Sequence, residues 1–212
     1  MNYKNYILPL VVVGVVIGSV LVGILLSSKK EVVGTVIGDS IQASDNQTGN
    51  QQATIELVEY ADFQCPACAS YDPMVKKLLE EHKDWIRFAY RHFPLKAIHP
   101  NAVSAAQASE AAGLQGKFFE FKEVLYTKQS EWSKSGDPTP RFMEYARELG
   151  LDEERFTRDM RSEEVAVKVE SQYQTAVALG LNSTPSFLLN RKKIANPQTY
   201  EQFVELLRNE VK

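Results

Sequence analysis

The chain has 212 residues, of which 44% are hydrophobic and 24% are charged, and its formal net charge is −3. These values fit one folded domain of ordinary size with additional segments. A small negative charge without any run of Lys or Arg gives no indication of a nucleic-acid partner. With two cysteines, the chain has too few for a scaffold built from several disulfides.

An uncharged apolar run occupies residues 7–26. Twenty helical residues span about 30 Å, the thickness of the hydrocarbon core of a bilayer. The alternative is a cleaved secretory signal, whose apolar region is usually only about 7–15 residues long. No small-residue cleavage site follows Leu26. We therefore predict an N-terminal signal anchor, a single transmembrane helix within residues 1–30.

The charges around this apolar run do not decide its orientation. Lys4 lies on one side, and Lys29 and Lys30 lie on the other, partly offset by Glu31. Positive residues favour the cytoplasmic side of a membrane, and here they flank the apolar run on both sides, so they predict no orientation. The orientation has to follow from the chemistry of the domain.

Residues 31–53 are rich in Gly, Ser, Asp, Asn and Gln. Such a composition is typical of a solvated, flexible spacer. We predict a linker here, and a folded domain over residues 54–212.

The domain begins with a β-rich run at residues 54–60, which is followed by Cys65 and Cys68 in a C-x-x-C motif. An amphipathic helix comes next, with apolar residues at helical spacing: Tyr71, Met74, Val75, Leu78 and Leu79. The free N–H groups and the positive dipole end of a helix N-terminus favour a thiolate, which indicates a reactive Cys65. Half of a zinc site is the alternative, but the chain has no second C-x-x-C and its three histidines are scattered. We expect a redox site without metal or cofactor.

The remaining elements complete an α/β pattern. Apolar and polar residues alternate over residues 85–93, which predicts a second strand. A strand, a helix and a strand in this order predict a parallel βαβ unit. Helical segments follow over about residues 100–180, then a β-hairpin over residues 186–194. A last helix is predicted to start at Asn196 and Pro197. The order is βαβ, a helical block, and ββα.

This order, with C-x-x-C after the first strand, resembles the thioredoxin fold of DsbA-like thiol–disulfide oxidoreductases. The resemblance covers roughly residues 54–212. It rests on several motifs in the right order, at residues 59–68, 90–95, 99–100, 115–119 and 180–187. The resemblance implies a thioredoxin fold with a helical insertion at about residues 100–180.

The resemblance also implies roles for the two cysteines. Cys65 would attack the disulfide of a partner, and Cys68, one turn further, would resolve the mixed disulfide. Pro66 suits the first helical position because it has no N–H to leave unsatisfied. Pro66 and Ala67 together tune the helix mouth. In strongly oxidising relatives the middle pair is Pro-His, so Ala67 leaves the direction of the reaction open.

Three further residues receive roles from the resemblance. The Thr184–Pro185 peptide bond is implied to be cis and to pack beside the C-x-x-C, with the Thr184 hydroxyl tuning the Cys65 thiolate. The alternative is an ordinary trans turn proline. Glu59, six residues before Cys65, would be a partly buried acid that moves protons to and from Cys68. The alternative for Glu59 is a carboxylate at the strand edge facing water.

Three functions follow from this reading. The first is a membrane-tethered oxidase that forms disulfides in exported proteins and is reoxidised by a membrane partner. The second is a reductase or isomerase with the same site, and the third is a peptide-binding or chaperone module without turnover. A disulfide donor belongs outside the reducing cytosol. We therefore expect a monomer at the cell membrane whose catalytic domain is extracytoplasmic.

Overall fold

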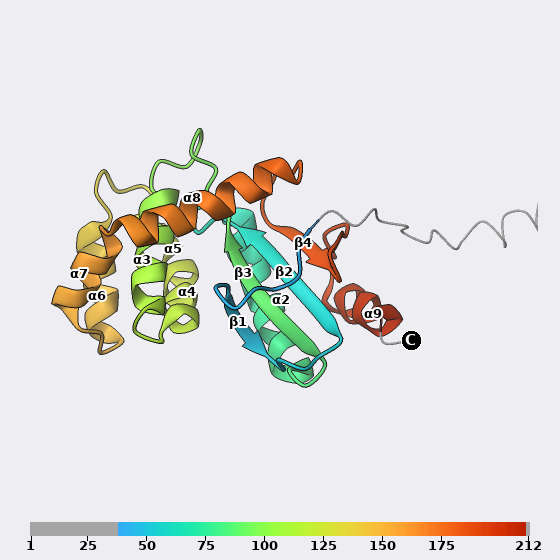
Figure 1. Ribbon diagram of the computed structural model, residues 1–212. Coiled ribbons are helices and arrows are strands. Elements are labelled where there is room, and N and C mark those ends of the chain that lie inside the picture. The colour runs from blue at the N-terminus through green and yellow to red at the C-terminus, as the bar shows by residue number, and fades with distance from the viewer. Residues whose placement is uncertain (1–37, 211–212) are drawn as a thin grey trace, which may run out of the picture. The chain divides into compact units, whose positions relative to one another are not determined.

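The computed structural model describes residues 38–210 (Figure 1). The predicted transmembrane helix at residues 7–26 lies outside the described residues. From residue 38 to residue 210, no helix is both long enough and apolar enough to cross a bilayer. The strands are β1 (Asn46–Gly49), β2 (Ile55–Ala61), β3 (Ile86–His92), β4 (Ser186–Leu189) and β5 (Lys192–Lys193). The helices are α2 (Pro66–His82), α3 (Ala102–Gly113), α4 (Phe118–Thr127), α5 (Gln129–Trp132), α6 (Thr139–Glu148), α7 (Glu153–Met160), α8 (Glu163–Ala178) and α9 (Tyr200–Glu210).

The strands form one mixed sheet in the order β1-β3-β2-β4-β5. β2 and β3 run parallel and are joined through α2, which confirms the predicted βαβ unit. β4 pairs antiparallel with the other side of β2, and β1 pairs antiparallel with the outer side of β3. In this register Glu59 of β2 lies between Tyr90 of β3 and Phe187 of β4.

The two faces of the sheet are covered by different helices (Figure 1). Because successive side chains of a strand point to opposite faces, β2 divides its residues between two cores. Ile55 and Leu57 belong to the larger core, with residues of α2, α4 and α9. Val58 and Tyr60 belong to the smaller core, with residues at the end of α8 and beyond. Glu59 lies an even number of residues from Ile55 and Leu57 along β2. Its side chain therefore points to the same face of the sheet, the one that α2 covers.

Within residues 54–210 the predicted order of elements is confirmed, with one shifted boundary. The helical block spans α3 to α8, from Ala102 to Ala178, as predicted for about residues 100–180. The last helix begins at Tyr200 rather than at Asn196 and Pro197. The Asn196 side chain donates to the Pro185 carbonyl at 2.8 Å. The Thr199 hydroxyl accepts the N–H of Gln202 at 3.3 Å, so the helix is capped three residues later than predicted.

The prediction of a flexible linker over residues 31–53 is wrong for the described part, residues 38–53. β1 adds an edge strand to the sheet there, and Ile41 is buried against the smaller core. The Arg91 guanidinium donates to both oxygens of Asp45, at 2.7 and 3.0 Å, and to the Ser40 carbonyl at 3.1 Å. Ser40 and Asp45 thus meet a buried polar partner of the sheet, while residues 42–44, 51 and 52 are exposed to solvent.

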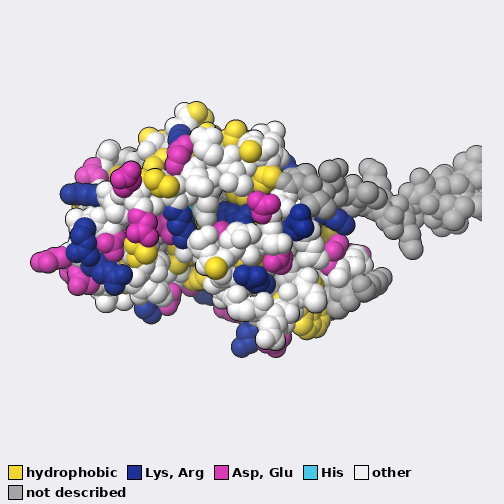
Figure 2. All heavy atoms as spheres, in the orientation of Figure 1, with side chains coloured by type: hydrophobic (Ala, Val, Ile, Leu, Met, Phe, Trp, Pro, Cys, Tyr) yellow, Lys and Arg dark blue, Asp and Glu magenta, His cyan; other side chains and the backbone are white. Residues whose placement is uncertain are grey.

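Ion pairs on the surface differ from the buried Arg91–Asp45 pair because their side chains are exposed to solvent. Figure 2 shows Lys and Arg side chains lying among Asp and Glu side chains over one face of the molecule. The Arg147–Glu153 pair, with N–O distances of 2.8 and 2.9 Å, has a well-exposed guanidinium. Exposed pairs of this kind contribute little to stability because water screens both charges.

The Arg91–Asp45 pair makes a prediction about stability. Arg91→Met leaves the Asp45 carboxylate buried and unpaired, so we expect the free energy of unfolding to fall by about 3–5 kcal/mol. Denaturant titration followed by circular dichroism measures this change. Arg147→Met removes an exposed pair and is the matched control, for which little change is expected. Equal effects of the two variants would contradict a structural role for residues 38–53.

Candidate active site

Cys65 occupies the N-cap position of α2, with backbone angles φ −72° and ψ 121°. No side chain caps this helix, and Pro66 stands at its first position, as predicted. The Cys65 side chain makes no capping hydrogen bond at this helix end, so the first N–H groups of α2 have no side-chain acceptor. The N–H groups of Cys68 and Ala67 nevertheless help to lower the pKa of the Cys65 thiol at the helix start.

The two thiols lie in different environments. Both cysteines are free thiols here; Cys65 is 7% exposed and Cys68 is fully buried. The hydrogen bond from the Cys68 thiol, helped by the Thr184 side chain and the two N–H groups, lowers the pKa of Cys65 to about 5. Burial, together with the adjacent Cys65 sulfur, raises the pKa of Cys68 well above its ordinary value. At neutral pH, Cys65 is a thiolate and Cys68 is protonated.

The loop before β4 closes the site from the other side. The Thr184–Pro185 peptide bond is cis, which confirms the prediction. Because Ser186 pairs with Tyr60 near the end of β2, the register brings this loop beside the start of α2. The Cys65 sulfur lies 3.5 Å from the Thr184 carbonyl oxygen. The Thr184 hydroxyl is buried and has no hydrogen-bond partner among residues 38–210. The Thr184 side chain is among the groups that lower the pKa of Cys65.

Glu59 is buried, which rules out the alternative of a carboxylate facing water. Its side chain lies on the α2 side of the sheet, and neither of its oxygens has a hydrogen-bond partner within residues 38–210. Burial raises the pKa of Glu59 to about 7; Lys122 opposes this shift and Asp72 adds to it. The charge of Glu59 in turn raises the pKa of Cys68, so the two groups interact.

The wall around Glu59 and Cys68 is aromatic. Tyr90 and Tyr126 share a hydrogen bond between their hydroxyls at 3.0 Å, and Phe63 stacks on Tyr90 with ring centroids 5.0 Å apart. Burial, with the nearby Cys68 and Glu59, raises the pKa of Tyr90 well above its ordinary value, and Tyr126 shifts the same way. Both tyrosines therefore stay neutral, and the wall keeps water from the carboxylate.

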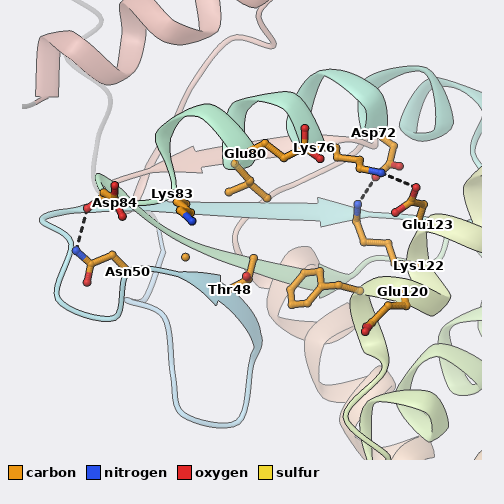
Figure 3. Close-up of a pocket in the computed structure, with 13 residues that line it drawn as sticks. Thr48, Asn50, Asp72, Lys76, Glu80, Lys83, Asp84, Glu120, Lys122 and Glu123 are labelled. Carbon is orange, nitrogen blue, oxygen red and sulfur yellow. Dashed lines mark hydrogen bonds and ion pairs between the residues drawn. The ribbon is translucent and has the colours of Figure 1, made fainter.

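Two charged residues near Glu59 were missed by the sequence analysis. Lys122 of α4 and Asp72 of α2 form a buried ion pair. Both line a cavity of about 660 Å³ between α2, α4 and the end of β1 (Figure 3). The more exposed Lys76–Glu123 pair, at 2.5 Å, lies beside them. Asp72 and Lys122 thus line a cavity at the surface and also act on Glu59 through their charges.

A signal for both residues was present in the sequence. Asp72 lies four residues after Cys68 and three before Val75, on the buried side of α2. Lys122 likewise lies on the buried side of α4, between Phe118 and Leu125. A charged residue inside an apolar helical stripe is rarely left unpaired, which makes it a candidate for a buried polar cluster.

Comparison with known proteins agrees with this geometry. The sequence profile of the family described as Thioredoxin matches residues 43–209. The chain belongs to the thioredoxin family. The match includes β1, so the domain of this family starts within the segment predicted as a linker.

Solved structures of DsbA-like proteins share the fold of this chain. α-DsbA1 of Wolbachia pipientis has a TM-score of 0.71 and 21% identity, covering 80% of this chain and 92% of that one. BdbD of Bacillus subtilis has a TM-score of 0.73 and 22% identity, covering 84% and 98%. A thioredoxin-like oxidoreductase of Silicibacter pomeroyi is 27% identical with a TM-score of 0.67, covering 82% and 94%. The predicted thioredoxin fold, as DsbA-like proteins have it, is confirmed.

Curated relatives are longer proteins. The Na(+)/H(+) antiporter NhaA 1 of Mycolicibacterium gilvum is 38% identical over 157 residues, which are 72% of this chain and 24% of the antiporter. NhaA 3 of Salinispora tropica is 33% identical over 157 residues, 74% of this chain and 23% of that protein. The chain spans about a quarter of the length of the curated relatives it matches.

The burial of Glu59 makes a prediction about pH. The pKa of Glu59 is about 7 in the folded protein, against an ordinary 4.5, so folding favours its protonated form. The resulting stability is fully present below pH 4.5 and is lost as the pH rises through 7. Glu59→Gln is neutral at every pH, so it should gain about 2–3 kcal/mol relative to the unmodified protein between pH 4 and pH 8.

Denaturant titrations of both proteins at pH 4, 6 and 8 measure this gain. Glu56→Gln is the control, because Glu56 lies on the same strand but points to the other face and pairs with Arg87 at 3.6 Å. A stability difference between Glu59→Gln and the unmodified protein that does not change with pH would contradict a buried, titrating Glu59.

Proposed function

We propose that the chain is an extracytoplasmic thiol–disulfide oxidoreductase, tethered through residues 7–26, that forms disulfides in exported proteins. One observation carries the proposal. At the mouth of α2, Cys65 is slightly exposed with a pKa of about 5, while Cys68 beneath it is fully buried with a raised pKa. That asymmetry is what an exchange reaction between two sulfurs requires.

The reaction starts from a disulfide between Cys65 and Cys68. A substrate thiolate attacks the Cys65 sulfur, because that sulfur is the one within reach of solvent. A mixed disulfide with Cys65 forms, the Cys65–Cys68 bond breaks, and Cys68 leaves as a thiolate that takes up a proton. A second substrate thiolate then attacks the substrate sulfur of the mixed disulfide, and Cys65 leaves. The substrate loses two electrons and the chain gains them.

Glu59 supplies the proton that Cys68 needs. With a pKa of about 7, Glu59 holds a proton in a substantial fraction of molecules at neutral pH and can also give it up. The proton returns to solvent by way of Asp72, Lys122 and the cavity that they line. Transfer in the opposite direction accompanies reoxidation of the chain.

The environment of Cys65 favours the oxidising direction. A stabilised Cys65 thiolate lowers the free energy of the reduced chain, so the disulfide is more readily given to a substrate. The same thiolate is a good leaving group in the last step. An electron acceptor in the membrane then restores the disulfide.

Reductase or isomerase activity at the same site is the second candidate. Its support is Ala67, which adds neither charge nor side-chain donor at the helix mouth, whereas a histidine there would stabilise the thiolate further. This difference makes the Cys65–Cys68 disulfide a milder oxidant than one with Pro-His between its cysteines.

The proposed location follows from the oxidising direction. Disulfides persist outside the reducing cytosol, so a disulfide donor and its substrates belong on the far side of the membrane. An anchor at residues 7–26 would keep the domain close to a membrane redox partner and to newly exported chains.

Three variants test the proposed chemistry. Cys65→Ser should abolish oxidation of a dithiol peptide, because it removes the sulfur that substrate attacks. Cys68→Ser should accumulate mixed disulfides with a disulfide-bonded peptide, because the Cys65 thiolate attacks the peptide disulfide, one peptide sulfur leaves as a thiolate, and no Cys68 thiol is present to release the other. Glu59→Gln keeps both thiols and should slow the release of Cys68 about tenfold or more at pH 7.

Mass spectrometry of trapped species and stopped-flow fluorescence measure these effects. A Cys65→Ser protein that still performs its role in cells would favour a binding module without turnover. Release of Cys68 at an unchanged rate in Glu59→Gln would remove Glu59 from the proton path.

The redox potential separates the two directions. Equilibration with glutathione should give a potential between about −120 and −200 mV, the range of disulfide donors. Ala67→His should make the potential more positive, because it adds a donor at the helix mouth. A value below about −230 mV, towards that of thioredoxin, would favour the reductase.

A further inference from the structure

The loop that carries Cys65 is held by side chains from a distant part of the chain. Gln129, at the start of α5, donates through Nε2 to the Phe63 carbonyl at 2.7 Å and to the Cys65 carbonyl at 3.1 Å. In sequence, Gln129 lies more than sixty residues from both of its partners. α5 belongs to the helical block, beside α3 and α4 (Figure 1).

The residue between those two carbonyls is also anchored to the helical block. The side-chain carbonyl of Gln64 accepts the N–H of Asn101 at 2.7 Å, and its amide donates to the Ser133 carbonyl at 2.6 Å. Asn101 in turn donates through Nδ2 to the Ser135 carbonyl at 2.8 Å. Both ends of the Gln64 amide are therefore used.

The first residue of the loop is fixed in the same way. The buried Asp62 carboxylate accepts the N–H groups of Gln64 and Leu95 at 2.7 and 2.8 Å, and its Oδ2 lies 2.7 Å from His99 Nδ1. The Asp62 carbonyl accepts the N–H of Cys65 at 3.1 Å. Every residue from Asp62 to Cys65 thus has a main-chain or side-chain hydrogen bond that limits its movement.

Gln129 differs from the Gln64 and Asp62 side chains because its own side chain bonds the main chain of Cys65. The Cys65 carbonyl already accepts the N–H of Ala69 at 3.2 Å, the bond that starts α2. Gln129 holds the same carbonyl from outside the helix. The main chain of Cys65 fixes the base of the side chain, so its position sets how close the sulfur can lie to the N–H groups of Ala67 and Cys68.

We propose that Gln129 is a positioning residue for Cys65, which holds the sulfur over the start of α2 through the carbonyls of Phe63 and Cys65. The helical block is then part of the active site and not only a cover for it. The proposal rests on the proposed function in that Cys65 is taken as the nucleophile.

The test titrates the thiolate of the reduced protein by its absorbance at 240 nm. Gln129→Leu removes both hydrogen bonds, so the titration midpoint of Cys65 should rise by about half to one pH unit, the size of one lost neutral hydrogen bond. Alkylation of Cys65 by iodoacetamide at pH 5 should slow about two- to fivefold. Gln129→Glu keeps the shape of the side chain but cannot donate, and its charge should raise the midpoint further.

Gln115→Leu is the matched control. Gln115 also bridges two main-chain groups of one residue, at 2.9 and 3.2 Å from Asp152, but it lies away from the cysteines. A merely structural role for Gln129 predicts that both leucine variants lower the melting temperature and leave the midpoint unchanged, which would overturn the proposal. A shift with Gln129→Glu but not with Gln129→Leu would also overturn it, because charge alone would then explain the effect.

The readout keeps the two proposals separate. The titration needs no substrate, so an unmodified protein that fails to oxidise dithiol peptides would end the proposed function and leave the midpoint comparison valid. Conversely, active protein with no shift in Gln129→Leu would end only the role of Gln129.

Discussion

The start of α2 has no side-chain cap, and Cys65 stands at its N-cap position, where the N–H groups of Cys68 and Ala67 lower the pKa of the thiol. A helix leaves its first N–H groups without partners, and an anion close to them is stabilised by both hydrogen bonds and the helix dipole. In this protein the anion is the nucleophile itself. Stability of the helix end and reactivity of the thiol are therefore the same interaction, and each neighbouring element contributes by keeping the sulfur in place.

A second interaction is the buried cluster of charged groups that includes Glu59 of the sheet, whose charge acts on Cys68. Glu59, Lys122 and Asp72 come from β2, α4 and α2, and all three are buried. When Glu59 is protonated the three groups sum to zero charge, and when it ionises they sum to −1 in a poorly hydrated site. Burying an uncompensated charge is costly, which is why Glu59 holds its proton up to about pH 7. The cluster exchanges one proton in the pH range where the thiol chemistry takes place.

Much of the fold and of the site could be predicted from the sequence, because the information for it is local. Apolar periodicity predicts β2, α2 and β3, and the position of Cys65 at a strand-to-helix junction predicts its exposure to the helix end. What could not be predicted depends on contacts between distant residues. β1 is short and polar, so no apolar pattern marks it, and its place is decided by Asp45 meeting Arg91. Gln129 gives no signal of its own, because a glutamine that reaches two carbonyls looks the same in sequence as one that faces water.

The structure also changes how much Ala67 tells about whether the chain oxidises or reduces its substrates. From the sequence, the lack of a histidine between the cysteines indicates a milder oxidant. In the structure, however, the groups that stabilise the Cys65 thiolate are the Cys68 thiol, the Thr184 side chain and the N–H groups of Cys68 and Ala67. None of these depends on the side chain at position 67. A pKa of about 5 is thus reached with backbone and neighbouring groups alone, and a histidine could only add to a thiolate that is already stable. The oxidising direction therefore rests first on these backbone and neighbouring groups, and the side chain at position 67 only adjusts how strong the oxidant is.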